Sequence, residues 1–208
     1  MSALESLGGG HGSGQHGSSG LDPTAWAAER WRLLLGVRLF ILSEVTLFGA
    51  LFAAYFILRI EAPSWPPLST LHRPELGLVA ANTLILLSSS GTIAWAVGRA
   101  RADDRRGLVR GLATTLGLGA IFLVIQAWEF IHNGFGLADG VFGSTFYTLT
   151  GFHGAHVFGG LVAIGIVLNR ARLGLVGREH DTPVEAVSYY WHFVDAVWLT
   201  LFLTLYVL

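Results

Sequence analysis

Residues 36–58 read GVRLFILSEVTLFGALFAAYFIL, an apolar stretch with one basic residue near its start, Arg38, and one acid, Glu44. A helix of this length crosses the roughly 30 Å of hydrocarbon in a bilayer. Four more such stretches follow, at about residues 76–97, 108–131, 145–168 and 186–208. None alternates as a barrel strand does, and in lipid only helices and closed barrels satisfy the backbone. The sequence therefore predicts an all-α integral membrane bundle of five transmembrane helices.

The composition points the same way. The chain has 208 residues, of which 52% are hydrophobic and 13% charged, with no cysteine and a net charge of −1. Soluble domains carry roughly 25% charged residues, so these residues would not coat a water-exposed globule. The lack of cysteine excludes disulfides, thiolate metal sites and thiol catalysis. The near-neutral charge excludes nucleic acid as a partner.

The N-terminal residues differ from the rest of the chain. Residues 1–20 are rich in glycine, serine and histidine and contain no apolar run. This composition is typical of a flexible tail, which we place at residues 1–25. The remaining residues, 26–208, are predicted to form a single five-helix domain, because the connections between the apolar stretches are too short for another domain.

The distribution of arginine predicts how the bundle lies in the membrane. Eleven of the 13 basic residues flank the first stretch or lie around the second and fourth connections, and two, Arg59 and Arg73, lie on the other side. Under the positive-inside rule the N-terminus faces the cytoplasm and Leu208 lies on the opposite side. The eleven are Arg30, Arg32, Arg38, Arg99, Arg101, Arg105, Arg106, Arg110, Arg170, Arg172 and Arg178.

Titratable side chains inside the predicted spans are costly and mark either packing or function. Helical rise places Glu44, His156 and Asp195 at similar depth, each about 12–18 Å from a helix end. A spacing of three residues puts His153 beside His156, and His192 beside Asp195, on one face of each helix. Glu129 is expected near the outer surface. The candidate polar cluster is Glu44, Glu129, His153, His156, His192 and Asp195.

Three interpretations of this cluster stay open from the residues alone. It is a buried network that fixes helix packing, a group that handles protons, or a metal site. Carboxylates and imidazoles at one depth can neutralise each other by sharing protons. Two histidines three residues apart with a carboxylate also offer ligands for zinc or iron. A di-iron bundle, however, needs two Glu-x-x-His pairs, and the one such pair, Glu129 and His132, lies at another depth. A metal site is therefore the least favoured of the three interpretations.

Small and amide side chains are expected to join the helices. Asn82 and Gln126 are uncharged hydrogen-bonding residues inside predicted spans, where they suit contacts between helices. Glycines in the fourth span favour close helix approach, namely Gly151, Gly154, Gly159 and Gly160.

Several stretches resemble the signature elements of one family, subunit III of the haem–copper terminal oxidases. They cover all five predicted spans in order. The matching stretches are RLFILSE at residues 38–44, Asn82-Thr83, QAWEF at 126–130, GVFGSTF at 140–146, TGFHGAHV at 150–157 and YWHFVDAVW at 190–198. The chain resembles the five-helix bacterial form of this family rather than the seven-helix form.

The resemblance implies a subunit of a proton-pumping, oxygen-reducing cytochrome c oxidase in a bacterial plasma (inner) membrane, with its C-terminus on the periplasmic or extracellular side. In this family haem and copper belong to subunits I and II, and subunit III carries no redox centre, so the resemblance implies no catalytic residue and no metal ligand on this chain. It packs beside subunit I, contacts other subunits and membrane lipids, stabilises the core and supports proton uptake.

The family also implies roles for particular residues. Glu44 and His156, with His153 and Asp195, match the positions of the family's buried polar cluster, and His192 accompanies them in the last signature. Arg59 and Arg170 are candidates for binding lipid phosphate, although arginines near a membrane surface also snorkel without a specific ligand.

Other functions remain as alternatives. A quinol oxidase has a similar subunit III, and a related family acts as an accessory protein in nitric oxide reduction. An independent ion transporter with Glu44 on its ion path is a third possibility. It would need a discontinuous helix or an internal repeat, and the sequence shows neither.

Overall fold

The computed structural model describes residues 23–62, 65, 76–176 and 181–207, and over this part of the chain the regular structure is helical throughout. Five long helices follow one another: α1 (Pro23–Glu61), α2 (Leu76–Arg101), α3 (Arg105–His132), α4 (Gly140–Arg172) and α5 (Thr182–Phe202). A short π-helical turn, Leu203–Val207, continues α5. Each long helix is long and apolar enough to cross a membrane. The predicted all-α bundle of five membrane-spanning helices is confirmed.

The first four helices are longer than the apolar stretches that predicted them, and α5 begins four residues before its stretch. α1 begins at Pro23 rather than near residue 36, so residues 23–25 belong to this helix and not to the predicted tail. Proline suits the first turn of a helix, and the following Ala, Glu and Arg residues are good helix formers. Hydropathy therefore locates the lipid-facing part of each helix but not its ends. The rest of the predicted tail, residues 1–22, lies outside the described residues, as do Arg73, Arg178 and Leu208.

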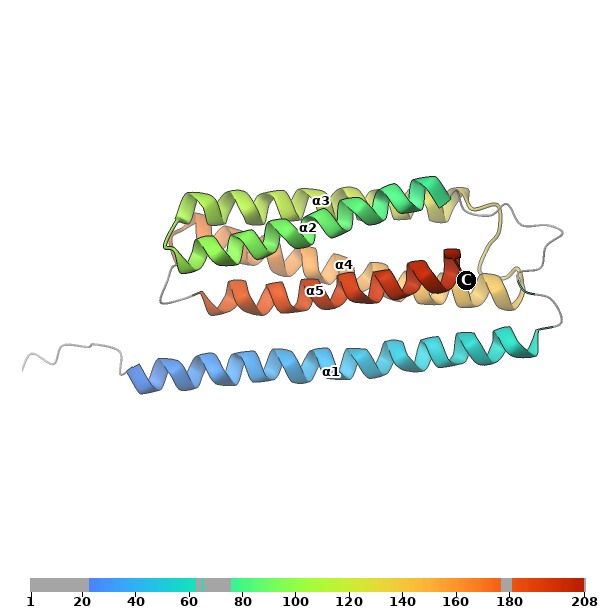
Figure 1. Ribbon diagram of the computed structural model, residues 1–208, viewed down its shortest axis with the longest axis horizontal. Coiled ribbons are helices and arrows are strands. Elements are labelled where there is room, and N and C mark those ends of the chain that lie inside the picture. Colours follow the sequence, from blue (N-terminus) through green and yellow to red (C-terminus); the bar gives the residue numbers. More distant parts are fainter. Residues whose placement is uncertain (1–22, 63–64, 66–75, 177–180, 208) are drawn as a thin grey trace, which may run out of the picture.

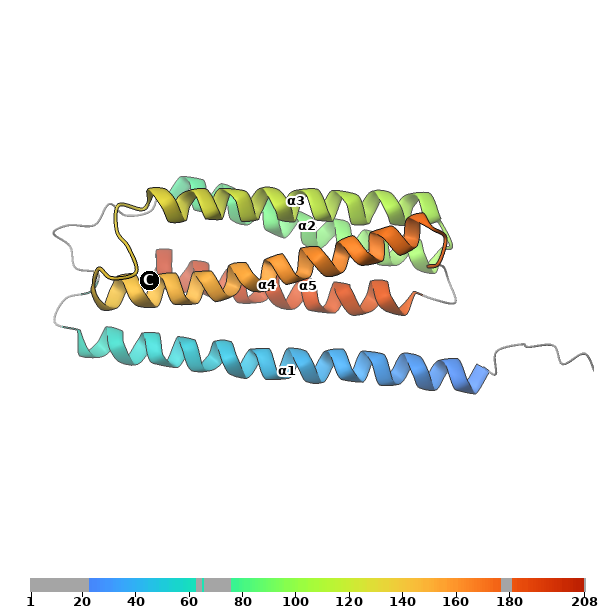
Figure 2. The ribbon, with the colours of Figure 1, turned by 180° about the vertical axis from the view of Figure 1, so that it is seen from behind.

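Successive helices run in opposite directions, and they form layers (Figure 1). α2 and α3 pair on one side, α4 and α5 lie in the middle, and α1 lies on the other side, against α5 and α4 (Figure 2). The start of α1 thus lies at the same end of the bundle as the α2–α3 connection and the end of α4. Most of the described arginines gather there, namely Arg30, Arg32, Arg99, Arg101, Arg105, Arg106, Arg110, Arg170 and Arg172, while Arg59 lies at the opposite end.

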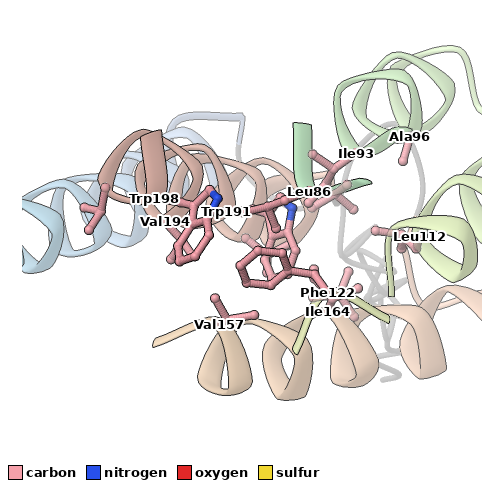
Figure 3. Close-up of a cluster of buried hydrophobic side chains, with 14 of the residues drawn as sticks. Leu86, Ile93, Ala96, Leu112, Phe122, Val157, Ile164, Trp191, Val194 and Trp198 are labelled. Atoms are coloured by element: carbon pink, nitrogen blue, oxygen red, sulfur yellow. The ribbon is translucent and has the colours of Figure 1, made fainter. Parts of the chain in front are cut away.

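Two buried tryptophans of α5 form the centre of the core (Figure 3). The indole N–H of Trp191 donates to Ser89 Oγ, and that of Trp198 donates to Thr83 Oγ1, both at 2.9 Å. Both acceptors belong to α2. Phe122 of α3 packs edge-on against Trp198, with ring centroids 4.9 Å apart. The two indoles therefore fill the core and also satisfy their polar groups there, as buried Trp side chains require.

Two amide side chains join neighbouring helices, as the sequence predicts. Asn82 of α2 donates to the carbonyl oxygen of Phe122 at 3.2 Å. Gln126 of α3 donates to the carbonyl oxygen of Thr150 in α4 at 3.5 Å. These contacts link α2, α3 and α4 by hydrogen bonds in the interior of the bundle.

Side chains also fasten the arginine-rich end. Asp104 caps α3 by accepting from the backbone N–H of Gly107 at 2.9 Å. Arg105 donates to the carbonyl oxygens of Ala171 and Arg172, at the end of α4. The chain then turns at Gly174, whose φ of +77° is a left-handed conformation that favours glycine.

Trp191 occupies a space that two glycines leave open. A Cβ at Gly119 of α3 would lie 2.7 Å from Trp191 Cη2, and one at Gly160 of α4 would lie 2.9 Å from Trp191 Cε3. Of the four α4 glycines predicted to allow close approach, Gly160 does so most tightly, while a Cβ at Gly151 would meet nothing within 4 Å.

This packing predicts different effects for two nearby glycines of α3. Gly119→Ala should lower the free energy of unfolding by about 1–3 kcal/mol, because the added methyl group overlaps Trp191. Gly117→Ala is the control, since its Cβ would meet nothing within 4 Å. It should leave stability unchanged or raise it by about 0.5–1 kcal/mol, because alanine favours the helix. Thermal unfolding in detergent measures both, and equal midpoints would contradict the packing.

Candidate functional site

Glu44 and His156 form a pair that joins α1 to α4. His156 Nε2 lies 2.8 Å from Glu44 Oε2, and both side chains are mostly shielded, at 15% and 16% exposure. The ring of Phe48, one turn along α1, packs edge-on against the imidazole with centroids 5.0 Å apart. From α5, the hydroxyl of Tyr190 donates to the backbone oxygen of His156 at 3.1 Å. Three helices thus meet at this pair.

The hydrogen bonds of His156 limit where its protons lie. Nδ1 is 2.7 Å from the carbonyl oxygen of Phe152, which can only accept, so Nδ1 carries a hydrogen. The contact between Nε2 and Glu44 then holds one further proton. With that proton on the imidazole the pair is an ion pair, and with it on the carboxyl group both partners are neutral. In both cases the pair has no net charge, which lowers the cost of placing it in a membrane.

His153 does not join this pair. Its side chain is fully buried and stacks on Trp198, with ring centroids 5.0 Å apart, while Phe122 packs edge-on against it. Neither ring nitrogen has a hydrogen-bond partner among the described residues. The spacing puts His153 and His156 on one face of α4, but the two imidazoles contact different helices. Three residues leave about 60° between the two side chains, and that turn directs them to different neighbouring helices.

Asp195 and His192 meet at a serine of α2. Ser90 Oγ donates to Asp195 Oδ2 and lies 3.0 Å from His192 Nδ1. Asp195 is buried and its Oδ1 has no partner in the described part of the chain, whereas His192 is exposed on the outside of the bundle. The sequence places these two residues on one face of α5 but gives no sign that Ser90 joins them.

Glu129 stands apart from the other five residues. It is buried close to the C-terminal end of α3, and the hydroxyl of Tyr206 donates to its Oε1 at 3.3 Å. Tyr206 lies in the turn that follows α5. The six predicted residues therefore lie in separate places: a pair at Glu44 and His156, a group at Ser90, and His153 and Glu129 each in its own surroundings.

The two arginines predicted to bind lipid lie at opposite ends of the bundle. Arg59 is half-buried in the last turn of α1, and Arg170 is exposed in the last turn of α4. Among the described residues, no group of three His, Asp or Glu side chains is arranged to hold a metal ion.

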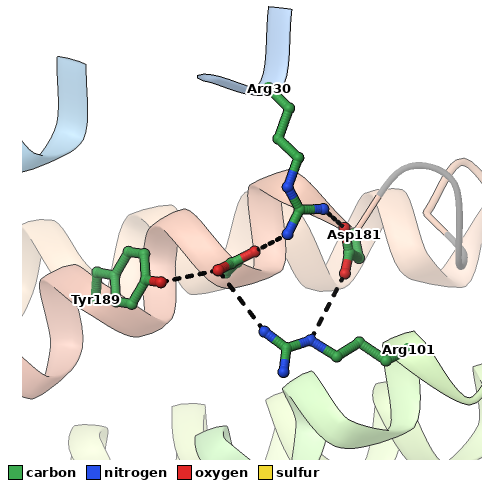
Figure 4. A network of polar contacts seen from close by, with 5 residues as sticks. Arg30, Arg101, Asp181 and Tyr189 are labelled. Atoms are coloured by element: carbon green, nitrogen blue, oxygen red, sulfur yellow. Dashed lines mark hydrogen bonds and ion pairs between the residues drawn. The ribbon is translucent and has the colours of Figure 1, made fainter. Parts of the chain in front are cut away.

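A charged network at the arginine-rich end was not predicted (Figure 4). Arg30 of α1 forms ion pairs with Asp181 at 2.5 Å and with Glu185, both near the start of α5. Arg101 of α2 approaches the same two carboxylates at 3.9 and 3.7 Å. Tyr189 donates to Glu185 at 2.8 Å. Two arginines and two buried acids balance one another and connect α1, α2 and α5.

One signal of this network was present in the sequence. Asp181 and Glu185 are four residues apart at the start of a helix, where acids are favourable and share a face. Their partner Arg30 lies 151 residues away from Asp181, and no local pattern relates the two.

The Glu44–His156 contact predicts coupled effects on stability. His156→Leu should lower the free energy of unfolding by about 1–3 kcal/mol, because it leaves the Glu44 carboxyl group without its partner. Glu44→Leu should also destabilise, and the double variant should lose less than the sum of the two changes. Unfolding in detergent measures this cycle. Strictly additive effects would contradict a direct contact.

The charged network predicts a contrast between two arginines of α1. Arg30→Ala should lower the free energy of unfolding by about 1–3 kcal/mol, because two buried carboxylates lose a donor. Arg32 is exposed and serves as the control, and Arg32→Ala should change stability by less than about 0.5 kcal/mol. The difference should shrink at high salt, because Arg30 is partly exposed. Equal losses for both variants would contradict the network.

Comparisons with known proteins indicate the same family over most of the chain. A family model described as "Cytochrome c oxidase subunit III" matches residues 24–208. The "Cytochrome c oxidase subunit 3" of Thermostichus vulcanus is 42% identical over 176 residues, which cover 84% of this chain and 87% of that protein. The protein of the same name from a Synechocystis species is 43% identical, over 84% of this chain and 75% of its own length. The "Probable cytochrome c oxidase subunit 3" of Nocardia farcinica is 40% identical, over 83% and 86%.

Proposed function

The chain belongs to the cytochrome c oxidase subunit III family, and on that premise we propose that it supports an oxidase core mechanically and electrostatically and carries no redox centre itself. As a member of this family it is a membrane protein and a component of an oxidase complex. Haem and copper would then lie in subunits I and II, and subunit I would be the direct packing partner.

The observation that carries this proposal is the contact between Glu44 and His156. Both nitrogens of His156 are engaged, one by Phe152 and one by Glu44. His153 is enclosed by aromatic rings. A metal or haem at either imidazole would have to displace these contacts. The arrangement therefore favours His156 paired with Glu44, and His153 packed among aromatic rings, over either imidazole as the ligand of a redox centre.

The same pair suits a proton-related role. The contact holds one proton that both partners can carry, so the pair can pass from an ion pair to a neutral pair without gaining net charge. Asp195, His192 and Glu129 add further titratable groups on α5 and α3. We assign to this set the family's support of proton uptake, with the Glu44–His156 pair as its centre.

The arrangement of arginine supports an orientation. The arginine-rich end would face the cytoplasm of a bacterial cell, with the C-terminus on the periplasmic or extracellular side of the plasma membrane. The five helices, from Pro23 onward, would form one domain. Arg59 and Arg170, at opposite ends, would bind phospholipid phosphate in the two leaflets.

The names of the relatives favour cytochrome c as the electron donor of the complex. They do not favour a quinol oxidase or an accessory role in nitric oxide reduction. A transporter with Glu44 on its path would need a broken helix, and α1 is continuous from Pro23 to Glu61.

The proposal predicts that Glu44→Gln shortens the time for which the oxidase stays active during turnover but leaves assembly of the complex largely unchanged. The amide can still donate to His156, so the chain should co-purify with the oxidase and initial oxygen consumption should stay near that of the wild type. Loss of about 1 kcal/mol from a charge-assisted contact makes its opening about fivefold more frequent, and activity should decline faster by about that factor during turnover.

Glu61→Gln is the matched control, because Glu61 is exposed at the end of the same helix. Its activity should persist as in the wild type. A Glu44→Gln oxidase that is as durable as the wild type would contradict the proton-related role. A complex that cannot be isolated would show that the pair serves assembly alone.

A further inference from the structure

An exposed imidazole lies near the middle of the bundle. His192 is ten residues beyond Thr182, the start of α5, which places it about 15 Å from the arginine-rich end at 1.5 Å per residue. Ser90 of α2 lies at a similar depth, eleven residues before Arg101. A polar side chain at this depth is costly against lipid tails and normally faces protein or a water-filled cavity. His192 instead lies on the outer surface of this chain.

The hydrogen bonds of His192 show that a neighbouring group would have to supply a donor. Ser90 has one hydroxyl hydrogen, which it donates to Asp195 Oδ2. The contact of 3.0 Å between Ser90 Oγ and His192 Nδ1 is therefore donated by the imidazole. A neutral ring with a hydrogen on Nδ1 presents a lone pair on Nε2. That nitrogen has no hydrogen bond within the described part of the chain, so it is an acceptor directed away from Ser90.

The surface around His192 has small side chains. On α2, Gly91 and Ala94 follow Ser90 by one and four residues, and on α5, Ala196 lies one turn beyond His192; all three are exposed. A Cβ at Gly91 would meet nothing within 4 Å. Small residues let another transmembrane helix approach closely. We call the set His192, Ala196, Gly91 and Ala94 the α2–α5 face.

Other outward surfaces are suited to lipid. The outer surface of α3 carries large apolar side chains that are strongly exposed, including Ile121, Val124 and Ile131, at 49%, 68% and 80%. A surface of this kind has nothing to gain from a polar neighbour. The α2–α5 face differs in having both a hydrogen-bond acceptor and room for close approach.

We propose that the α2–α5 face docks a transmembrane helix of a neighbouring oxidase subunit, which donates a hydrogen bond from a hydroxyl, amide or indole N–H to His192 Nε2. This inference rests on the proposed function, since it assumes an oxidase complex. Lipid tails offer no donor. A second copy of this chain, related by a twofold axis, would place two acceptors opposite each other. A helix of a different subunit with a donor at this depth would supply the hydrogen bond and would also avoid placing two acceptors opposite each other.

Three variants of His192 separate docking from packing within the chain. The side-chain nitrogen of asparagine reaches about as far as Nδ1 and can donate as Nδ1 does, and the side-chain oxygen of glutamine reaches about as far as Nε2 and can accept as Nε2 does. His192→Gln should therefore keep the partner contact, His192→Asn should keep only the Ser90 contact, and His192→Leu should lose both. The measurement is the amount of this chain retained by the purified oxidase through a series of harsher detergent washes.

Docking predicts that retention of the Gln variant stays close to that of the wild type. Retention of the Asn and Leu variants should fall about three- to tenfold, as expected for loss of a hydrogen bond between transmembrane helices. A purely internal role predicts the opposite order, with the Asn variant retained and the Gln variant lost. That order, or equal retention of all variants, would overturn the proposal.

A photoreactive amino acid at Ala196 identifies the neighbour directly, with Val124 of α3 as the control. In the intact oxidase, we expect the probe at Ala196 to crosslink to another oxidase subunit and the probe at Val124 to crosslink to lipid. Crosslinks from Ala196 to lipid alone or to a second copy of this chain, or subunit crosslinks from Val124 only, would overturn the proposed face. A wild-type chain that purifies without any oxidase subunit would instead overturn the proposed function.

Discussion

The fold depends on one constraint: the N–H and O–H donors that join the helices inside a bilayer need acceptors within the protein. The two core tryptophans meet it through Ser89 and Thr83 of α2. The amides of Asn82 and Gln126 meet it through backbone oxygens of the next helix. Because each of these contacts crosses from one helix to another, satisfying the polar groups and assembling the bundle are the same process.

Helix α1 depends on such polar contacts more than the other helices do. It lies at the edge of the bundle and is mostly exposed, so apolar packing within the chain secures it less than the other helices. Polar contacts hold it at three levels. Arg30 binds two acids at the arginine-rich end, Glu44 binds His156 in the interior, and the hydroxyl of Tyr55 donates to the carbonyl oxygen of Thr204 at 3.1 Å near the other end. The Glu44–His156 pair is therefore a structural attachment of α1.

Apolar stretches were enough to predict the number of helices and their membrane-spanning character, and Asn82 and Gln126 joined helices as expected. The pairing of titratable residues was harder to predict, because it depends on the rotation of each helix about its axis and on residues far apart in the chain. Depth alone predicted one level for Glu44, His156 and Asp195, but it did not reveal that Glu44 pairs with His156 or that Ser90 holds Asp195. Spacing did not reveal that His153 stacks on Trp198, and nothing local linked Arg30 to Asp181.

The central claim is that Glu44 and His156 satisfy each other and that this chain holds no redox centre. The measurement that tests it most directly is an electron cryo-microscopy map of the oxidase that contains this chain, at a resolution that shows side chains and metal ions. The account predicts Glu44 within hydrogen-bonding distance of His156 Nε2, and haem and copper in other subunits. Iron or copper bound to His153 or His156, or a Glu44 side chain turned away from His156, would contradict it.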